Sequence, residues 1–92
     1  MLTIKYTKLA IADLNNAYEY ICAENPSAAR DVIGKIKVTL AHLQTQPFLG
    51  HIGRVENTYE FLVFGTPFII VYMIDGDNLI VVSILHTSKK YP

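Results

Sequence analysis

The feature that most restricts the fold of this chain is a pair of apolar segments near its end, separated by a tight-turn sequence. Residues 67–75 and 78–85 are predicted to be strands, and Asp75-Gly76-Asp77-Asn78 between them predicts a hairpin. Both segments are apolar at nearly every position instead of at every second one. Both faces of this hairpin therefore need covering by other parts of a protein.

Two helices are predicted ahead of the hairpin, over about residues 7–24 and 26–44, because apolar residues recur there at helical spacing. Thr7 and Asn25 stand where N-caps belong, and Pro26 suits the first position of a helix. The link between the helices is very short, so we expect them to form an antiparallel pair. Pro47 ends the helical region.

Further strands are predicted over residues 2–6 and 55–64, which gives the order β-α-α-β-β-β. A chain of 92 residues makes one domain, here residues 1–92. We therefore expect an α+β fold in which a helix hairpin packs on a mainly antiparallel sheet.

The predicted hairpin carries more apolar surface than two helices on one face can cover. One set of alternating residues in the first strand is Ile69, Val71 and Met73, and the other is Ile70, Tyr72 and Ile74. In the second strand, strict alternation opposes Leu79, Val81, Ser83 and Leu85 to Ile80, Val82 and Ile84. Either the helices straddle the sheet, or loops and tail cover the second face, or another protein does. Large apolar patches usually mark interfaces, which favours the partner protein.

Charge and cysteine content exclude several classes of protein. The eight basic and eight acidic residues cancel, which argues against a broadly basic nucleic-acid binder, and we expect no sequence-specific DNA binding by this chain. A single cysteine, Cys22, cannot form an internal disulfide, which indicates a reducing compartment. No signal peptide is recognisable, and the longest uncharged run, residues 61–74, is too short for a membrane helix of about 20 residues. The sequence thus predicts a cytoplasmic protein without membrane contact.

Four polar residues are candidates for chemistry: Arg54, Glu60, His86 and Tyr91. A carboxylate or imidazole can abstract the 2′-hydroxyl proton of RNA, a guanidinium can stabilise the phosphorane, and an imidazole or phenol can protonate the leaving oxygen. The ordinary alternative pairs Glu60 with Arg54 and leaves His86 bonded to nearby backbone at a strand end. No zinc-ligand spacing, glycine-rich phosphate loop or nucleophile elbow is present, so we expect no metal and no cofactor.

Several segments in the same order resemble the RelE/ParE toxins. Residues 53–63 are similar to the family's glycine-arginine-valine strand, residues 67–72 to its proline-aromatic-aliphatic strand, and residues 85–92 to its leucine-histidine tail. Residues 12–14, 18–21 and 25–29 resemble its helix hairpin. The resemblance covers nearly the whole chain. It implies a toxin of a type II toxin–antitoxin pair, neutralised by a small antitoxin that wraps it.

An antitoxin is also a suitable cover for the second face of the sheet. The residues expected to contact it are Ile70, Tyr72, Ile80 and Val82.

The resemblance leaves two targets open, because RelE-like members cleave mRNA on the ribosome and ParE-like members poison DNA gyrase. Ile69 stands where the nuclease branch tends to carry an arginine, and a neutral chain lacks the basic field that binds ribosomal RNA. Both features favour the gyrase poison. The residues expected to face its target are His86, Lys89, Lys90 and Tyr91.

The alternatives are a ribosome-dependent endoribonuclease and a degenerate, non-toxic antitoxin-binding module. The first would use Arg54, Glu60, His86 and Tyr91. The second follows from departures from the family pattern: Tyr59 replaces an arginine, Lys89 replaces another, and Tyr91 replaces a tryptophan.

Overall fold

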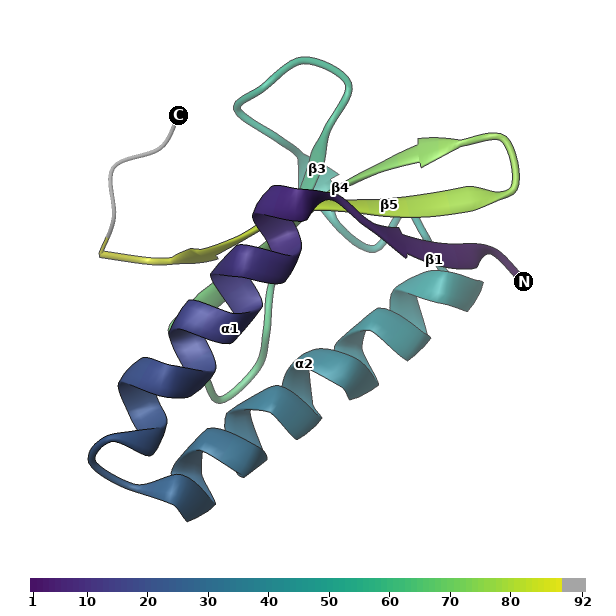
Figure 1. Cartoon of the computed structure of the whole chain (residues 1–92). Helices are drawn as coiled ribbons and strands as arrows, with labels where there is room; N and C mark the ends of the chain where they lie inside the picture. Colours follow the sequence, from purple (N-terminus) through teal and green to yellow (C-terminus); the bar gives the residue numbers. More distant parts are fainter. Residues whose placement is uncertain (89–92) are drawn as a thin grey trace.

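A computed structural model describes residues 1–88 and has the α+β architecture expected from the sequence (Figure 1). Its elements in chain order are β1 (Thr3–Tyr6), α1 (Lys8–Cys22), α2 (Pro26–Thr45), β2 (His51–Ile52), β3 (Tyr59–Leu62), β4 (Phe68–Asp75) and β5 (Asn78–His86). Neither helix is long and apolar enough to cross a membrane in this part of the chain.

Both helices begin at the predicted caps. The Thr7 hydroxyl accepts a hydrogen bond from the Ala10 N–H at 3.0 Å, and the Asn25 side-chain oxygen accepts one from the Ala28 N–H at 3.1 Å. Each bond satisfies an amide that a helix start would otherwise leave without a partner. The helix positions predicted from the sequence are confirmed to within two residues.

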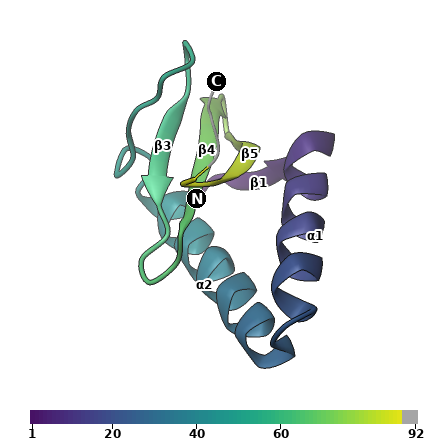
Figure 2. The ribbon, with the colours of Figure 1, turned by 90° about the vertical axis from the view of Figure 1, so that its left-hand side faces the viewer.

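Within residues 1–88 the sheet has five strands in the order β1-β5-β4-β3-β2, with β1 parallel to β5 and the other pairs antiparallel. Figure 2 shows β3, β4, β5 and β1 of this sheet. The strand predicted over residues 55–64 is shorter than expected, because residues 53–58 form a loop in which Asn57 has a φ of 66°. The two-residue strand β2 was not predicted. It pairs His51 with Glu60 and Ile52 with Tyr59.

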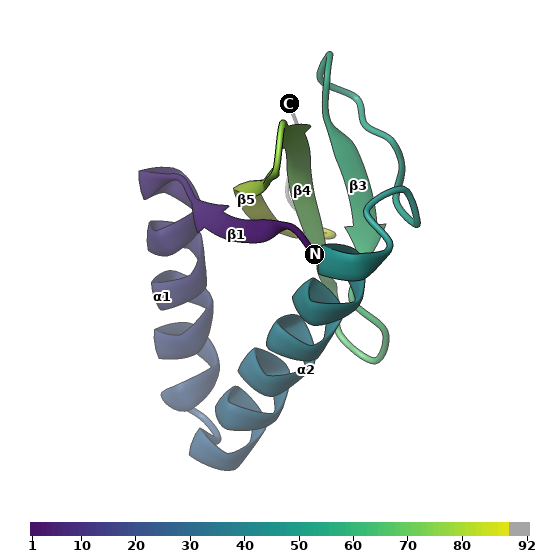
Figure 3. The same cartoon turned by 90° about the vertical axis from the view of Figure 1, so that its right-hand side faces the viewer.

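The two helices form a V whose open end is spanned by β1 (Figure 3). The core lies between the helices and the sheet. Its fully or nearly fully buried side chains include Ala10 and Ala17 of α1, Ile36, Leu40 and Leu43 of α2, and Ile70, Tyr72, Leu79 and Val81 of the sheet. The helices therefore cover one face of the sheet and do not straddle it.

A β-bulge changes the faces predicted for β5. Tyr72 pairs with Val81 and Val71 pairs with Ser83, so Val82 is an extra residue in β5. Beyond the bulge Ile84 lies opposite Ile70 on the helix-covered face and is buried in the core. The strict alternation assumed for residues 78–85 is thus wrong after Val81.

The side chain of Asp13 completes the outer edge of β5. β1 pairs with β5 only as far as Val81. Past that point, one oxygen of Asp13 on α1 accepts hydrogen bonds from the Ser83 hydroxyl at 2.7 Å and from the Ile84 N–H at 3.0 Å. A helix side chain thereby replaces the missing strand partner.

Two of the residues expected to contact an antitoxin lie inside the protein. Ile70 and Tyr72 have no exposed surface and belong to the core beneath the helices, so the expectation that they meet a partner is wrong. Ile80 and Val82 are half-buried. On the opposite face Val71 is fully buried, and the other apolar residues of β4 and β5 are half-buried.

Tyr72 joins the sheet to the segment after α2. Its hydroxyl donates a hydrogen bond to the Pro47 carbonyl at 2.6 Å and accepts one from the Gly50 N–H at 3.1 Å. A side chain at Gly50 would collide with this hydroxyl. Tyr59 stacks on the Tyr72 ring at 5.6 Å between centroids, and burial raises the pKa of Tyr72.

We predict that Tyr72→Phe destabilises the protein by about 1–3 kcal/mol, because it leaves the part-buried Pro47 carbonyl and the buried Gly50 amide without this partner. Urea unfolding measures this change. The control is Tyr20→Phe, at a tyrosine that is 79% exposed, which should stay within about 0.5 kcal/mol of wild type. Equal stability of the two variants would contradict the assignment.

Candidate functional site

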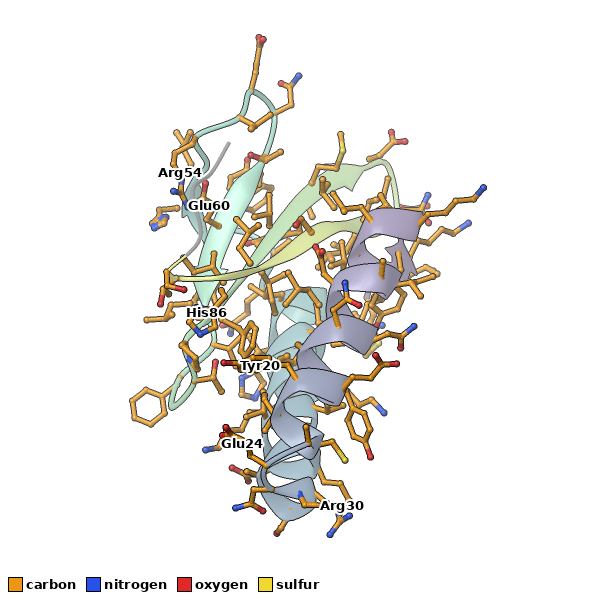
Figure 4. The ribbon with its side chains drawn as sticks, turned by 60° about the vertical axis from the view of Figure 1, so that its left-hand side comes forward. Tyr20, Glu24, Arg30, Arg54, Glu60 and His86 are labelled. Carbon is orange, nitrogen blue, oxygen red and sulfur yellow. The ribbon has the colours of Figure 1, made fainter. Side chains whose placement is uncertain are left out.

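The loop between β2 and β3 brings Arg54 over Glu60 on the face of the sheet away from the helices (Figure 4). The Arg54 backbone N–H donates to one carboxylate oxygen of Glu60 at 2.8 Å, and its terminal guanidinium nitrogen donates to the other at 2.9 Å. The Arg54 Nε adds a contact of 3.1 Å. The pairing of these two residues, the ordinary alternative in the sequence, is confirmed.

The local sequence explains why the loop turns back so sharply. The Gly53 N–H donates to the Thr58 carbonyl at 2.8 Å, and a β-carbon at Gly53 would collide with the Thr58 hydroxyl. Asn57 supplies the left-handed backbone that the turn requires, which asparagine tolerates better than most residues. Glycine at position 53 thus allows Arg54 to reach Glu60.

The electrostatics of this pair fix its charge state. Glu60 is only 4% exposed, and the hydrogen bonds from Arg54 lower its pKa below the ordinary value although burial acts in the opposite direction. The carboxylate is therefore ionised and fully engaged at neutral pH. A general base at pH 7 benefits from a pKa near 7, so this environment moves Glu60 away from that role.

His86 lies at the end of β5 on the opposite, helix-covered face. It pairs with Phe68, and the two rings meet edge to face at 5.3 Å between centroids. The Ser88 N–H donates to His86 Nδ1 at 3.1 Å, so a neutral imidazole here carries its proton on Nε2. His86 is thus bonded to nearby backbone, as the ordinary alternative expected.

The structure does not bring His86 and Glu60 together. Glu60 lies opposite Val71 and His86 lies opposite Phe68, three residues along β4 and on the other face of the sheet. Three residues of strand span about 10 Å. Figure 4 shows His86 apart from the Arg54–Glu60 pair.

The remaining predicted site residues fall at the end of the chain. Lys89, Lys90 and Tyr91 lie outside the described residues. Across residues 1–88, no group of three or more histidine, cysteine, aspartate or glutamate side chains is arranged to hold a metal ion.

His86 lines a cavity of about 370 Å³ against α1, which the sequence analysis missed. The helix contributes Asp13, Asn16, Ala17 and Tyr20 to its wall. These positions follow the i, i+3, i+4, i+7 spacing of one helix face, so the pattern was present in the sequence. The sequence pattern did not show that this helix face lies against the end of β5.

Comparison with known proteins identifies the class of protein. Residues 4–91 match the family model described as the ParE toxin of the type II toxin–antitoxin system parDE. The chain has the fold of the RelE/ParE toxin superfamily. Within that superfamily it belongs to the ParE toxin family.

Individual proteins are similar to this chain in sequence or in fold. The chain is 29% identical over 89 residues to Y4kP of Sinorhizobium fredii, a match that covers 97% of this chain and 92% of that protein. Its fold is similar to a chain in the chromosomal ParDE system of P. aeruginosa, with a TM-score of 0.83, 21% identity and coverage of 94% and 96% of the two chains. It is also similar to a chain in the intact E. coli RelBE complex, with a TM-score of 0.67, 14% identity and coverage of 97% and 100%.

We predict that the Glu60 carboxylate stabilises the fold above its unfolded-state pKa and that this contribution is lost as the pH falls through the lower folded-state pKa. Wild type should therefore exceed Glu60→Gln in stability at pH 7, and the difference should shrink below about pH 4.5. Urea unfolding between pH 3 and 7 measures both curves.

The matched control is Glu56→Gln, an exposed carboxylate in the same loop, which should follow the wild-type curve. A constant difference between wild type and Glu60→Gln over the whole pH range would contradict the assignment of charge to Glu60.

Proposed function

We propose that this ParE-family toxin acts by binding and inhibiting DNA gyrase and that a cognate antitoxin neutralises it. Family membership supplies the class of protein. The observation that carries the choice of target is the separation of the candidate catalytic groups: Glu60 is engaged by Arg54, and His86 lies on the other face of the sheet.

An RNA-cleaving site needs a base, an acid and a cation around one phosphate. In residues 1–88 the carboxylate and its guanidinium are bonded to each other, and the imidazole lies about 10 Å away along the strand. This arrangement supports a toxin that acts by binding.

The charge of the chain supports the same choice. Contacts to phosphates supply much of the affinity of proteins that bind nucleic acid, and they require an excess of lysine and arginine. Eight basic residues are balanced here by eight acidic ones. A protein target suits a neutral surface better than ribosomal RNA does.

The antitoxin is proposed from the structural neighbours. The P. aeruginosa relative is described as part of a ParDE system, and the E. coli relative as part of a RelBE toxin–antitoxin complex. Exposed apolar side chains on this chain give a partner protein something to cover.

We predict that the purified toxin inhibits supercoiling by DNA gyrase and that an equimolar amount of the antitoxin restores it. An agarose-gel supercoiling assay measures both effects. Unimpaired supercoiling at a stoichiometric excess of toxin would contradict the proposal. Toxin-dependent breaks in a translated mRNA, read by primer extension, would favour the endoribonuclease instead.

The residues proposed to face gyrase are His86, Lys89, Lys90 and Tyr91. We predict that reversing both charges, with Lys89→Glu and Lys90→Glu, weakens inhibition of supercoiling by about tenfold, in the range expected for loss of a small number of interface charges. The control is Lys37→Glu, at an exposed position of α2, which should leave inhibition unchanged. Full activity of the double variant would remove the tail from the gyrase-binding surface.

A further inference from the structure

The cavity between α1 and the end of β5 combines an apolar wall with a polar one. The apolar wall is formed by three buried residues, Ala17, Phe68 and Ile84. Asp13 and His86 belong to the polar wall. The volume of about 370 Å³ is at the lower end of the range of about 300–1,000 Å³ found for ligand pockets. A cavity of this size suits one large side chain better than a larger ligand.

The charge of the cavity comes from Asp13. One of its carboxylate oxygens accepts the hydrogen bonds from Ser83 and Ile84. The other oxygen accepts none from residues 1–88, and since this part of the chain has no buried polar side-chain atom without a partner, that oxygen is open to solvent. None of the lysines or arginines of the described chain lines the cavity. The open oxygen therefore favours a cationic ligand.

Two more residues of α1 favour a guanidinium over an ammonium group. Tyr20 is 79% exposed and lines the cavity together with His86, close to it in Figure 4. A planar guanidinium can stack on such a ring. Asn16 follows Asp13 at i, i+3 spacing, which places the two side chains about 5–6 Å apart. The spread N–H groups of one guanidinium can donate to both side chains, whereas an ammonium is a compact point charge.

We propose that this cavity binds an arginine side chain of the protein that the toxin inhibits. The guanidinium donates to the open oxygen of Asp13 and to the side-chain oxygen of Asn16 and stacks on Tyr20. Its methylene groups pack on the apolar wall. The inference rests on the proposed gyrase target for the source of the arginine, and it extends the target-facing surface from His86 onto α1.

The variant Asn16→Arg supplies a guanidinium to the cavity from the toxin itself, and Asn15→Arg is its matched control. Both asparagines are exposed on α1, but of the two only Asn16 lines the cavity. Arginine favours a helix over asparagine, so both variants should have at least the urea midpoint of wild type. In the supercoiling assay, Asn16→Arg should weaken inhibition by at least about tenfold and Asn15→Arg by less than about twofold. Equal inhibition by the two variants would overturn the inference.

A peptide titration separates this inference from the proposed function. A capped alanine–arginine–alanine peptide should give saturable shifts of the Ala17 and His86 amide signals in nitrogen-15 NMR spectra of wild type. The neutral citrulline analogue should bind at least about tenfold more weakly, because it lacks the charge that Asp13 recognises. If wild type does not inhibit gyrase, the proposed target is wrong, and the titration still decides the cavity.

Two outcomes of the titration would overturn the inference. The first is the absence of a saturable shift with the arginine peptide. The second is a saturable shift with adenosine monophosphate and none with the peptide, which would assign the cavity to a nucleotide instead.

Discussion

The pairing of β4 with β5 is the constraint on which the rest of this structure depends. Both strands are apolar on two faces, and the tight turn at Gly76 fixes them side by side. One face is buried by α1 and α2, which fixes where the helices must lie. The bulge at Val82 then adds Ile84 to that core, and the edge it leaves beyond β1 is closed by Asp13.

The sequence was sufficient to predict the elements that depend on local signals. Thr7, Asn25 and Pro26 marked the helix starts, and the turn after Asp75 marked the hairpin. The bulge and β2 were not predictable, because a one-residue insertion and a two-residue strand leave no periodic pattern. A prediction from the sequence assumes strict alternation along β5. Because the bulge at Val82 breaks this alternation, the predicted faces are wrong after Val81.

The residues of the candidate site could be named from the sequence, but which of them lie close together could not. Arg54 and Glu60 were named from the sequence and are indeed bonded, whereas His86 was grouped with them because spacing along a chain does not tell which face a side chain occupies. Likewise, the sequence could not show that Ile70 and Tyr72 belong to the helix-covered face, where both are fully buried. One group of exposed apolar side chains, Val38, Leu62 and Phe64, lies at the sheet edge beside α2, where residues distant in sequence meet.

The parallel pairing of β1 with β5 makes the first strand of the chain depend on the last (Figure 1). Thr3 lies opposite Asn78, and the Thr7 hydroxyl donates to the Val82 carbonyl across 75 positions of sequence. During synthesis the amino-terminal strand has no partner until the final strand has left the ribosome. Contacts this distant in sequence form late and slowly. The growing chain therefore passes through an interval in which both helices are complete but the sheet that covers their apolar faces is not.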